Sequence, residues 1–294
     1  MKILSWNCRG LSNPRAVPNL KKLAQQHRPD IIFLSETLAN KRKMENIRVT
    51  LKFEACLSID VEGRSGGLAV LWRNSEVCSV LNFTRNFVNL MVKEDNKEEW
   101  RLSCYYGFPE RSRRKLAWDM IRDLRQMSST PWCIIGDFND LLSQDDKRGI
   151  HPHPNWLCLG FRKAISDCDL VDIPLEGYQF TWVKSRGSEQ MVEERLDRAF
   201  ASPDWLNLFP TVSLTTLIAS HSDHSSILLS CEMNQHVCNK FRFRFENSWL
   251  RDIDIKSVVE SGWKVGETSA IEDRIVSCAD NLEAWSKRRR INSK

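Results

Sequence analysis

Carboxylate, amide and imidazole side chains stand next to apolar, strand-like runs at several points along the chain. They are Asn7, Glu36, Asp137, Asn139, Asp197, Asp223 and His224. When such strands share one edge of a sheet, the polar groups at their ends converge in one cleft. Burying so many of them without partners would cost roughly several kcal/mol. A bound metal ion or a shared hydrogen-bond network offsets this cost, so the pattern predicts one or the other.

Each of these segments, taken alone, also has an ordinary structural interpretation. Glu36 could cap a helix or lie on the surface. Residues 136–139 have the composition of a turn, and residues 222–224 that of a solvated loop. Residues 195–198 could form a surface strand with a salt bridge. A functional site is favoured by the order and spacing of the whole set.

The elements that must position these groups are many short strands and a few helices. We expect strands at residues 2–8, 30–34, 55–59, 67–72, 77–83, 87–92, 101–106, 131–135, 178–183, 195–200, 211–218 and 226–231. We expect helices at residues 13–27, 111–126 and 155–168, where apolar residues recur at helical spacing. Because strands and helices do not alternate strictly, the order favours an α/β (α+β) protein with two packed sheets flanked by helices.

The bulk composition limits the classes of function. The 294 residues are 41% hydrophobic and 28% charged, which is ordinary for a globular protein. There is no run of about 18 apolar residues, which disfavours a membrane span, and the segment at residues 1–7 turns polar too soon for a signal peptide. The net charge of +5 tolerates a polyanionic partner without requiring one. Ten cysteines without paired zinc spacing favour a reducing compartment, either nucleus or cytoplasm.

Eight short segments occur together in a characteristic order. They are SWNCRG (5–10), LSET (34–37), SGGLAVLW (65–72), YYGFP (105–109), GDFN (136–139), FTW (180–182), RLDR (195–198) and SDH (222–224). As a set they resemble the exonuclease–endonuclease–phosphatase superfamily, and most of all the endonuclease domain of plant LINE-type (non-LTR) retrotransposons. The resemblance covers about residues 1–231. It implies a four-layered sandwich of two mixed β-sheets flanked by helices, like that of abasic-site endonucleases and pancreatic-type deoxyribonucleases.

The resemblance also implies a metal site and a catalytic group. Glu36 and Asn7 would hold Mg²⁺ or Mn²⁺, with Asp223 as a further carboxylate that faces the metal or orients a neighbour. His224 would contact the scissile phosphate or act as general acid or base, and Asp197 would orient it.

Three further groups complete the expected catalytic set. Asp137 would activate or position the attacking water. Asn139 and Tyr106 would donate hydrogen bonds to a phosphate oxygen.

Four residues are expected to bind DNA: Arg9, Thr181, Trp182 and Arg195. Arg9 stands where some abasic-site endonucleases carry an aspartate, which disfavours a two-metal scheme and strong abasic specificity. A surface position for Arg9 remains an alternative, as does simple core packing for Phe180 and Trp182.

The expected function is that of a metal-dependent phosphodiesterase that nicks duplex DNA, as in target-primed retrotransposition. Another phosphoesterase of the superfamily, acting on inositol phosphates or RNA, is one alternative, because fold membership does not settle the substrate. A catalytically silent remnant that only binds nucleic acid is another. Residues 1–235 would form the endonuclease/exonuclease/phosphatase domain. Residues 236–294 would form a basic helical tail or linker, with a strand at 241–245, helices at 252–263 and 270–287, and a cationic cluster at 287–290.

Overall fold

A computed structural model describes residues 1–11, 13–60, 66–94, 97–217, 222–231, 249, 252, 254–264 and 271–292. The chain divides into two compact units, Met1–Met233 and Asn234–Lys294. The strand expected at residues 241–245 lies outside the described residues.

The first unit contains a mixed sheet of seven strands. Across the sheet they are β11 (Leu175–Glu176), β15 (Ser213–Leu217), β16 (Ser226–Ser230), β1 (Lys2–Asn7), β2 (Ile31–Ser35), β4 (Leu68–Trp72) and β3 (Ala55–Ile59). Strands β1 and β2 run parallel, whereas β16 lies antiparallel to β1 on its other side. The ends of β1 and β2 therefore meet at one edge of the sheet.

A second mixed sheet has six strands. They are β10 (Val171–Asp172), β14 (Asp197–Ala201), β8 (Trp132–Asp137), β7 (Trp100–Tyr106), β6 (Phe87–Val92) and β5 (Cys78–Phe83). Strands β7 and β8 run parallel, and β14 lies antiparallel to β8. This arrangement brings the ends of β7 and β8 next to the start of β14.

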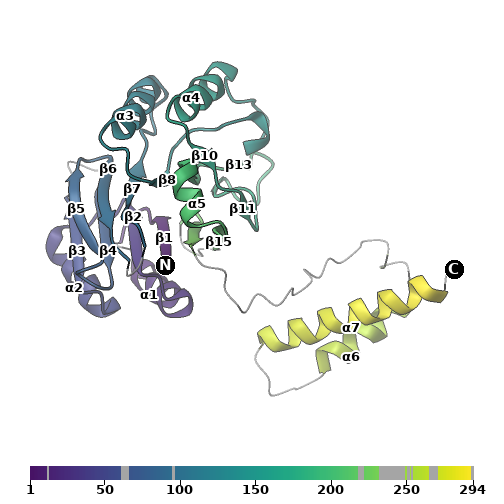
Figure 1. Ribbon diagram of the computed structural model, residues 1–294. Helices are drawn as coiled ribbons and strands as arrows, with labels where there is room; N and C mark the ends of the chain where they lie inside the picture. The colour runs from purple at the N-terminus through teal and green to yellow at the C-terminus, as the bar shows by residue number, and fades with distance from the viewer. Residues whose placement is uncertain are drawn as a thin grey trace. The chain divides into compact units, whose positions relative to one another are not determined.

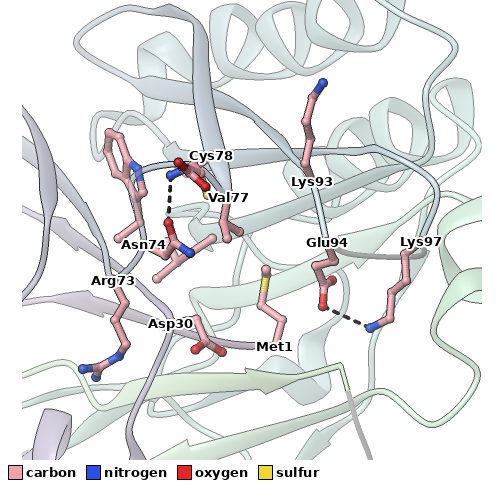
Figure 2. Close-up of a pocket in the computed structure, with 12 residues that line it drawn as sticks. Met1, Asp30, Arg73, Asn74, Val77, Cys78, Lys93, Glu94 and Lys97 are labelled. Atoms are coloured by element: carbon pink, nitrogen blue, oxygen red, sulfur yellow. Dashed lines mark hydrogen bonds and ion pairs between the residues drawn. The ribbon is translucent and has the colours of Figure 1, made fainter.

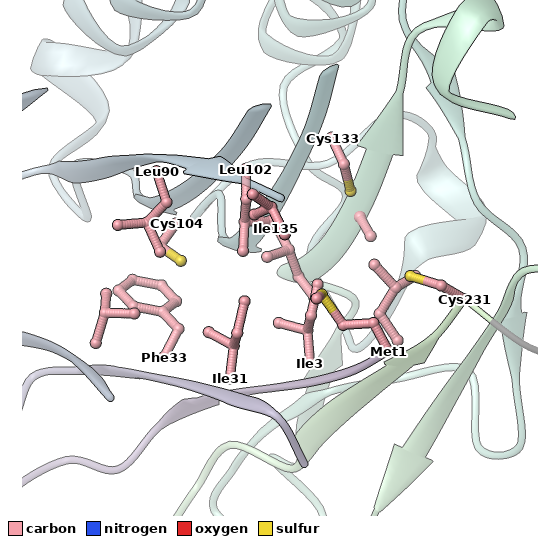
Figure 3. Packing of buried hydrophobic residues seen from close by; sticks show 14 of the residues in the cluster. Met1, Ile3, Ile31, Phe33, Leu90, Leu102, Cys104, Cys133, Ile135 and Cys231 are labelled. Atoms are coloured by element: carbon pink, nitrogen blue, oxygen red, sulfur yellow. The ribbon is translucent and has the colours of Figure 1, made fainter. Parts of the chain in front are cut away.

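The two sheets face each other across the largest apolar cluster among the described residues. Figure 3 shows Ile3 and Phe33 from the first sheet opposite Leu102 and Ile135 from the second. All four side chains are fully buried or nearly so. Burial of this apolar surface holds the two sheets together.

Helices cover the outer faces of both sheets (Figure 1). Helices α1 (Ala16–His27) and α2 (Lys41–Leu51) pack on the first sheet, and α3 (Arg114–Gln126) and α4 (Asn155–Asp167) on the second. The layers are thus helix, sheet, sheet and helix, which confirms the fold expected from the sequence.

Some elements differ from the sequence-based expectations. Helices α2 and α5 (Pro203–Leu208) were not expected. The strand expected at residues 178–183 is only Trp182–Lys184, labelled β12. With β13 (Val192–Glu194) and β9 (Lys147–Arg148) it forms a small third sheet. Short 3₁₀ turns at Arg111–Arg113 and Gln144–Asp146 complete the first unit.

The second unit contains two packed helices, α6 (Ile255–Lys264) and α7 (Ile271–Asn292). The Arg274 guanidinium lies over the Trp263 ring at 4.6 Å, and Asn281 Nδ2 donates to Ser261 Oγ at 3.2 Å. Among the described residues, no helix is both long and apolar enough to cross a membrane.

Candidate active site

Four of the expected site residues lie at one edge of the two sheets because of strand register. Asn7 ends β1 and pairs with Ser35, so Glu36 follows β2 directly beside it. Tyr106 ends β7 and pairs with Asp137, which ends β8. Parallel pairing thus carries all four side chains to the same end of the sandwich.

A hydrogen-bond network joins these side chains across the gap between the sheets. Asn7 Nδ2 donates to Glu36 Oε1 at 2.8 Å and to Asp137 Oδ2 at 2.9 Å. The Tyr106 hydroxyl donates to the same Glu36 oxygen at 2.9 Å. Glu36 is therefore held by donors from two different strands, β1 and β7, and Asp137 by a donor from β1.

His224 and Asp197 form a second, buried pair. His224 Nδ1 lies 2.9 Å from Asp197 Oδ2, and His224 Nε2 lies 3.8 Å from Asp137 Oδ2. Asp197 stands opposite Asp137 in the pairing of β14 with β8. An ionised Asp197 accepts the Nδ1 proton, which leaves Nε2 directed toward Asp137.

The electrostatics of the site follow from burial and from these pairs. Burial by itself lowers the pKa of His224, but Asp197 and Asp137 outweigh it and raise that pKa to about 9. Burial raises the pKa of Asp137 to about 6, against the opposing effect of His224. Burial, with Glu36 and Asp137 nearby, raises the pKa of Tyr106 far above its ordinary value. At neutral pH the imidazole is thus cationic and the phenol keeps the proton it donates.

Glu36 and Asn139 adopt backbone conformations that non-glycine residues rarely take. Glu36 has φ 51° and Asn139 has φ 53°. Asn139 is held there because its backbone N–H donates to Asp137 Oδ1 at 2.9 Å and its amide donates to Gly107 O at 3.1 Å. Such conformations cost roughly 1–3 kcal/mol each and tend to occur at functional sites.

Asn7 turns its Nδ2 donor toward Glu36, and its Oδ1 accepts the backbone N–H of Arg9 at 3.3 Å. Asp137, Asp197 and His224 place candidate ligand atoms within 4.8 Å of one another. However, the contact between His224 and Asp197 is already a 2.9 Å hydrogen bond, which leaves no room for an ion between them. Glu36 lines the cleft, and its Oε2 has no hydrogen-bond partner among the described residues. Magnesium prefers oxygen ligands and needs only one or two protein carboxylates.

The residues expected to bind DNA divide into two groups. Arg9 and Trp182 line the cleft, where the Arg9 guanidinium and Trp182 Nε1 both contact Asp223 Oδ2, the indole at 2.9 Å. Arg195 instead pairs with Asp172 at 3.3 Å and is not among the residues that line the cleft. The structure thus gives Arg195 a partner within the protein.

Thr181, also expected at the DNA, is buried beneath the site. Its hydroxyl oxygen accepts the backbone N–H groups of Leu196 at 3.1 Å and Asp197 at 2.9 Å. Its backbone carbonyl accepts from Ser225 N at 2.7 Å. Thr181 therefore joins the segment that carries Asp197 to the one that carries His224.

The site opens into a polar cleft of about 430 Å³. Sequence reasoning did not single out several of its lining residues: Arg111, Arg114, Lys147, His153 and Glu194. Lys147 pairs with Glu194 at 2.6 Å, and Arg114 donates to the carbonyl of Phe108 at 2.6 Å. Arg111 and Arg114 come from the 3₁₀ turn and the start of α3, and His153 comes from a loop. Lys147 and Glu194 come from the small third sheet, whose pairing no local pattern reveals.

A larger hollow of about 830 Å³ lies at the opposite ends of the strands (Figure 2). Met1 and Asp30, which precede β1 and β2, line it. Its charged groups are partly paired, as with Lys97 and Glu94 at 3.0 Å. It shares no lining residue with the polar cleft at the candidate site.

Comparison with known proteins agrees with this geometry. Residues 4–224 match the endonuclease/exonuclease/phosphatase family, so the chain belongs to this family of nucleases and phosphoesterases. The resemblance inferred from the eight sequence segments is thereby confirmed.

Individual relatives are distant. An uncharacterised 149 kDa protein of transposon TX1 from Xenopus laevis is 23% identical over 282 residues, which are 90% of this chain but 20% of that protein. Among solved structures, the endonuclease domain of TRAS1, a telomere-specific non-LTR retrotransposon, is 16% identical with a TM-score of 0.59, covering 80% of this chain and 99% of that one. The AP endonuclease LMAP from Leishmania major is 14% identical, with a TM-score of 0.59 and coverages of 78% and 86%. At these identities the two structures show a shared fold.

Proposed function

We propose that this protein is a metal-dependent phosphodiesterase that nicks duplex DNA and leaves a 3′-hydroxyl, as in target-primed retrotransposition. The observation that carries the proposal is the buried His224–Asp197 pair, which faces Asp137 beside the network of Asn7, Glu36 and Tyr106. A cationic imidazole next to anionic oxygens and a free carboxylate oxygen suits a phosphodiester and an attacking water.

Glu36 and Asn7 would hold Mg²⁺ or Mn²⁺ in this scheme. When bound, the cation would polarise the scissile phosphate and stabilise the charge on the leaving oxygen. Glu36 is suited to this part because Tyr106 and Asn7 fix one of its oxygens and leave the other without a partner among the described residues.

The remaining groups would act directly on the phosphate and the water. His224 Nε2 would donate to a phosphate oxygen, while Asp197 keeps the ring oriented through Nδ1. Asp137, 3.8 Å from that nitrogen, would position the attacking water. Asn139 and Tyr106 would donate to the same phosphate, and Tyr106 would first have to exchange its bond to Glu36.

DNA is supported as the substrate by the relatives and by the charge of the cleft. The TRAS1 structure is of an endonuclease domain from a retrotransposon, and the distant relative belongs to a transposon. Arg111 and Lys184 line the cleft and have no ion-pair partner within the described part of the chain. If the protein cleaves chromosomal DNA, this activity agrees with the expected location in the nucleus or cytoplasm. The location stays a prediction.

The experiment that tests the proposal is a comparison of substrates with identified products. Purified protein is incubated in Mg²⁺, in Mn²⁺ and in EDTA with supercoiled plasmid, single-stranded RNA and inositol polyphosphates. We expect nicked plasmid in either metal, and ends that a DNA polymerase extends without prior treatment. Release of inorganic phosphate from inositol polyphosphates, with the plasmid left intact, would overturn the proposal.

A further inference from the structure

Arg9, Asp223 and Trp182 form a cluster at the mouth of the cleft, beside the catalytic pair. One oxygen of Asp223, Oδ2, contacts the Arg9 guanidinium and also accepts from Trp182 Nε1 at 2.9 Å. Asp223 immediately precedes His224, and all three residues of the cluster line the cleft. The cluster therefore stands where a substrate strand must pass to reach His224.

One oxygen of the Asp223 carboxylate is already engaged by two protein groups. The Asp223 side chain is 17% exposed, and a guanidinium and an indole N–H share one of its oxygens. The other oxygen, Oδ1, is buried and has no hydrogen-bond partner among the described residues. A divalent cation at this carboxylate would lie within a few ångströms of a positive guanidinium, and like charges at that distance repel.

Both the backbone and the guanidinium of Arg9 are held in position at the cleft. Its backbone takes the left-handed conformation at φ 47°, and its N–H approaches Asn7 Oδ1 at 3.3 Å. The side chain is 61% exposed, and Asp223 is the one partner of its guanidinium in the described part of the chain. A guanidinium has five N–H donors in one plane, so a single carboxylate oxygen leaves most of them available.

We propose that Arg9, oriented by Asp223 and Trp182, binds a phosphate of the nucleic-acid strand next to the cleavage point, and that Asp223 is the counter-ion of Arg9 rather than a metal ligand. This inference rests on the proposed function for the nature of the strand. Of the two roles expected for Asp223 from the sequence, facing the metal or orienting a neighbour, the inference takes the second, which the contacts support. A planar guanidinium suits a phosphate because it can donate two parallel hydrogen bonds to it.

The metal arm of the test measures Mn²⁺ binding to the metal-free protein by electron paramagnetic resonance, without any turnover. Wild type is compared with Glu36→Gln and Asp223→Asn. We expect Glu36→Gln to weaken Mn²⁺ binding by about tenfold or more, since substitutions even at residues that only support a metal ligand have effects of this size. We expect Asp223→Asn to bind Mn²⁺ like wild type. Weakening by Asp223→Asn as large as that by Glu36→Gln would overturn the inference. If Glu36→Gln also binds like wild type, the metal site of the proposed function is what fails.

The phosphate arm measures binding of a fluorescent duplex in EDTA, where no cleavage occurs. We expect Arg9→Gln to weaken binding about tenfold, the size of one charged hydrogen bond, with Arg9→Lys between it and wild type. Arg15→Gln, which removes the same charge from an exposed arginine at the start of α1, serves as the matched control and should weaken binding less.

A double variant tests whether Asp223 acts through Arg9. If it does, Asp223→Asn weakens DNA binding when Arg9 is present, and adding it to Arg9→Gln causes no further loss. Equal binding by Arg9→Gln and wild type would overturn the proposal, and so would a full additive loss in the double variant. Absence of nicking by the wild-type protein would count against the proposed function. The measurements of Mn²⁺ binding and DNA binding would still test the roles of Asp223 and Arg9.

Discussion

At the scale of single residues, the buried carboxylate of Asp137 is positioned by several neighbours. It accepts from Asn7 Nδ2 and from the backbone of Asn139, and it faces His224 Nε2. Donors fixed in this way need little reorganisation when charge develops on a substrate, which is the main electrostatic source of rate enhancement. Loss of one positioning group should therefore slow the reaction without abolishing the fold.

Thr181 provides a test of this claim. Thr181→Val keeps the shape of the side chain but leaves the N–H groups of Leu196 and Asp197 without their acceptor. We expect the nicking rate at saturating DNA to fall at least about tenfold, because Asp197 would shift from its position against His224 Nδ1 and misplacement of a catalytic group slows the reaction. Thr181→Ser, which retains the hydroxyl, should restore most of the rate. A folded Thr181→Val protein that nicks as fast as wild type would show that Thr181 does not position Asp197.

At the scale of elements, Arg198 anchors the loops around the site to β14. Its guanidinium contacts Asp146 Oδ2 at 2.5 Å and Asp172 Oδ2 at 2.8 Å, and its side chain is 1% exposed. Asp146 in turn accepts the backbone N–H groups of Leu142 and Ser143, in the loop that follows Asn139. One buried cation therefore fixes the loop that leads away from the catalytic strand β8.

Removing that cation should destabilise the first unit strongly. Arg198→Met is expected to lower the free energy of unfolding by about 3 kcal/mol, because it leaves Asp146 without its cationic partner and Asp172 with Arg195 alone. The measurement is urea denaturation, with Arg162→Met on the exposed face of α4 as control. A decrease no larger than that of the control would contradict the anchoring role.

Gly136 in β8 tests the close packing of the central strands. A Cβ at this position would stand 1.8 Å from the carbonyl oxygen of Tyr105, and the backbone has φ 152°. Gly136→Ala should therefore cost more than about 3 kcal/mol of unfolding free energy. Gly66→Ala, which has a positive φ but no atom within 4 Å, should cost only about 1 kcal/mol. Equal destabilisation of the two variants in denaturant would show that the strands can move apart at Gly136.

Features of the fold and of the site could be predicted where they depend on residues that are close together in the sequence. Asn7 and Asp137 were identifiable because each ends an apolar run, and this pattern arises because β1 is buried from Ile3 onward and β8 is buried throughout. Helix α2 was missed because only Met44, Ile47 and Leu51 of its eleven residues are buried. A short apolar set of this kind gives a weak periodic signal.

The pairing between segments that are distant in the sequence could not be predicted. Thr181 lies in a segment whose composition is typical of a DNA-binding groove. It is buried, however, in a position where its backbone is hydrogen-bonded to Glu194 and Ser225. Arg195 carries a charge suited to DNA, but Asp172, 23 positions earlier, binds it. The small sheet of β9, β12 and β13 brings these segments together, and two- or three-residue strands leave little trace in a sequence.

At the scale of the whole molecule, the cationic end of α7 is predicted to aid DNA binding and not the chemistry. The cluster comprises Lys287, Arg288, Arg289 and Arg290. Replacing all four with Gln should weaken DNA binding and lower the salt slope by about 0.9 for each phosphate that the variant no longer neutralises. Nicking at saturating DNA should be unchanged, because the cluster lies outside residues 4–224, which match the family.

The control neutralises four cations on α1 and α2: Lys21, Lys22, Lys41 and Arg42. Affinity and salt slope are measured for both variants against wild type. An unchanged salt slope in the α7 variant would rule out the binding role. Failure to nick at saturating DNA would contradict the separation of the cluster from the active site.

The site as a whole is built from both sheets, since Asn7, Glu36 and His224 come from one and Tyr106, Asp137 and Asp197 from the other. The central claim is that these groups together hydrolyse a phosphodiester of duplex DNA with a divalent cation. The most direct measurement is the rate at which wild type and His224→Ala convert supercoiled plasmid to open circles in Mg²⁺ and in Mn²⁺. We predict metal-dependent conversion by wild type, none in EDTA, and a rate about 10²–10³ lower for His224→Ala, the usual effect of removing one transition-state donor. Plasmid left supercoiled by wild type in both metals, or nicking by His224→Ala at the wild-type rate, would contradict it.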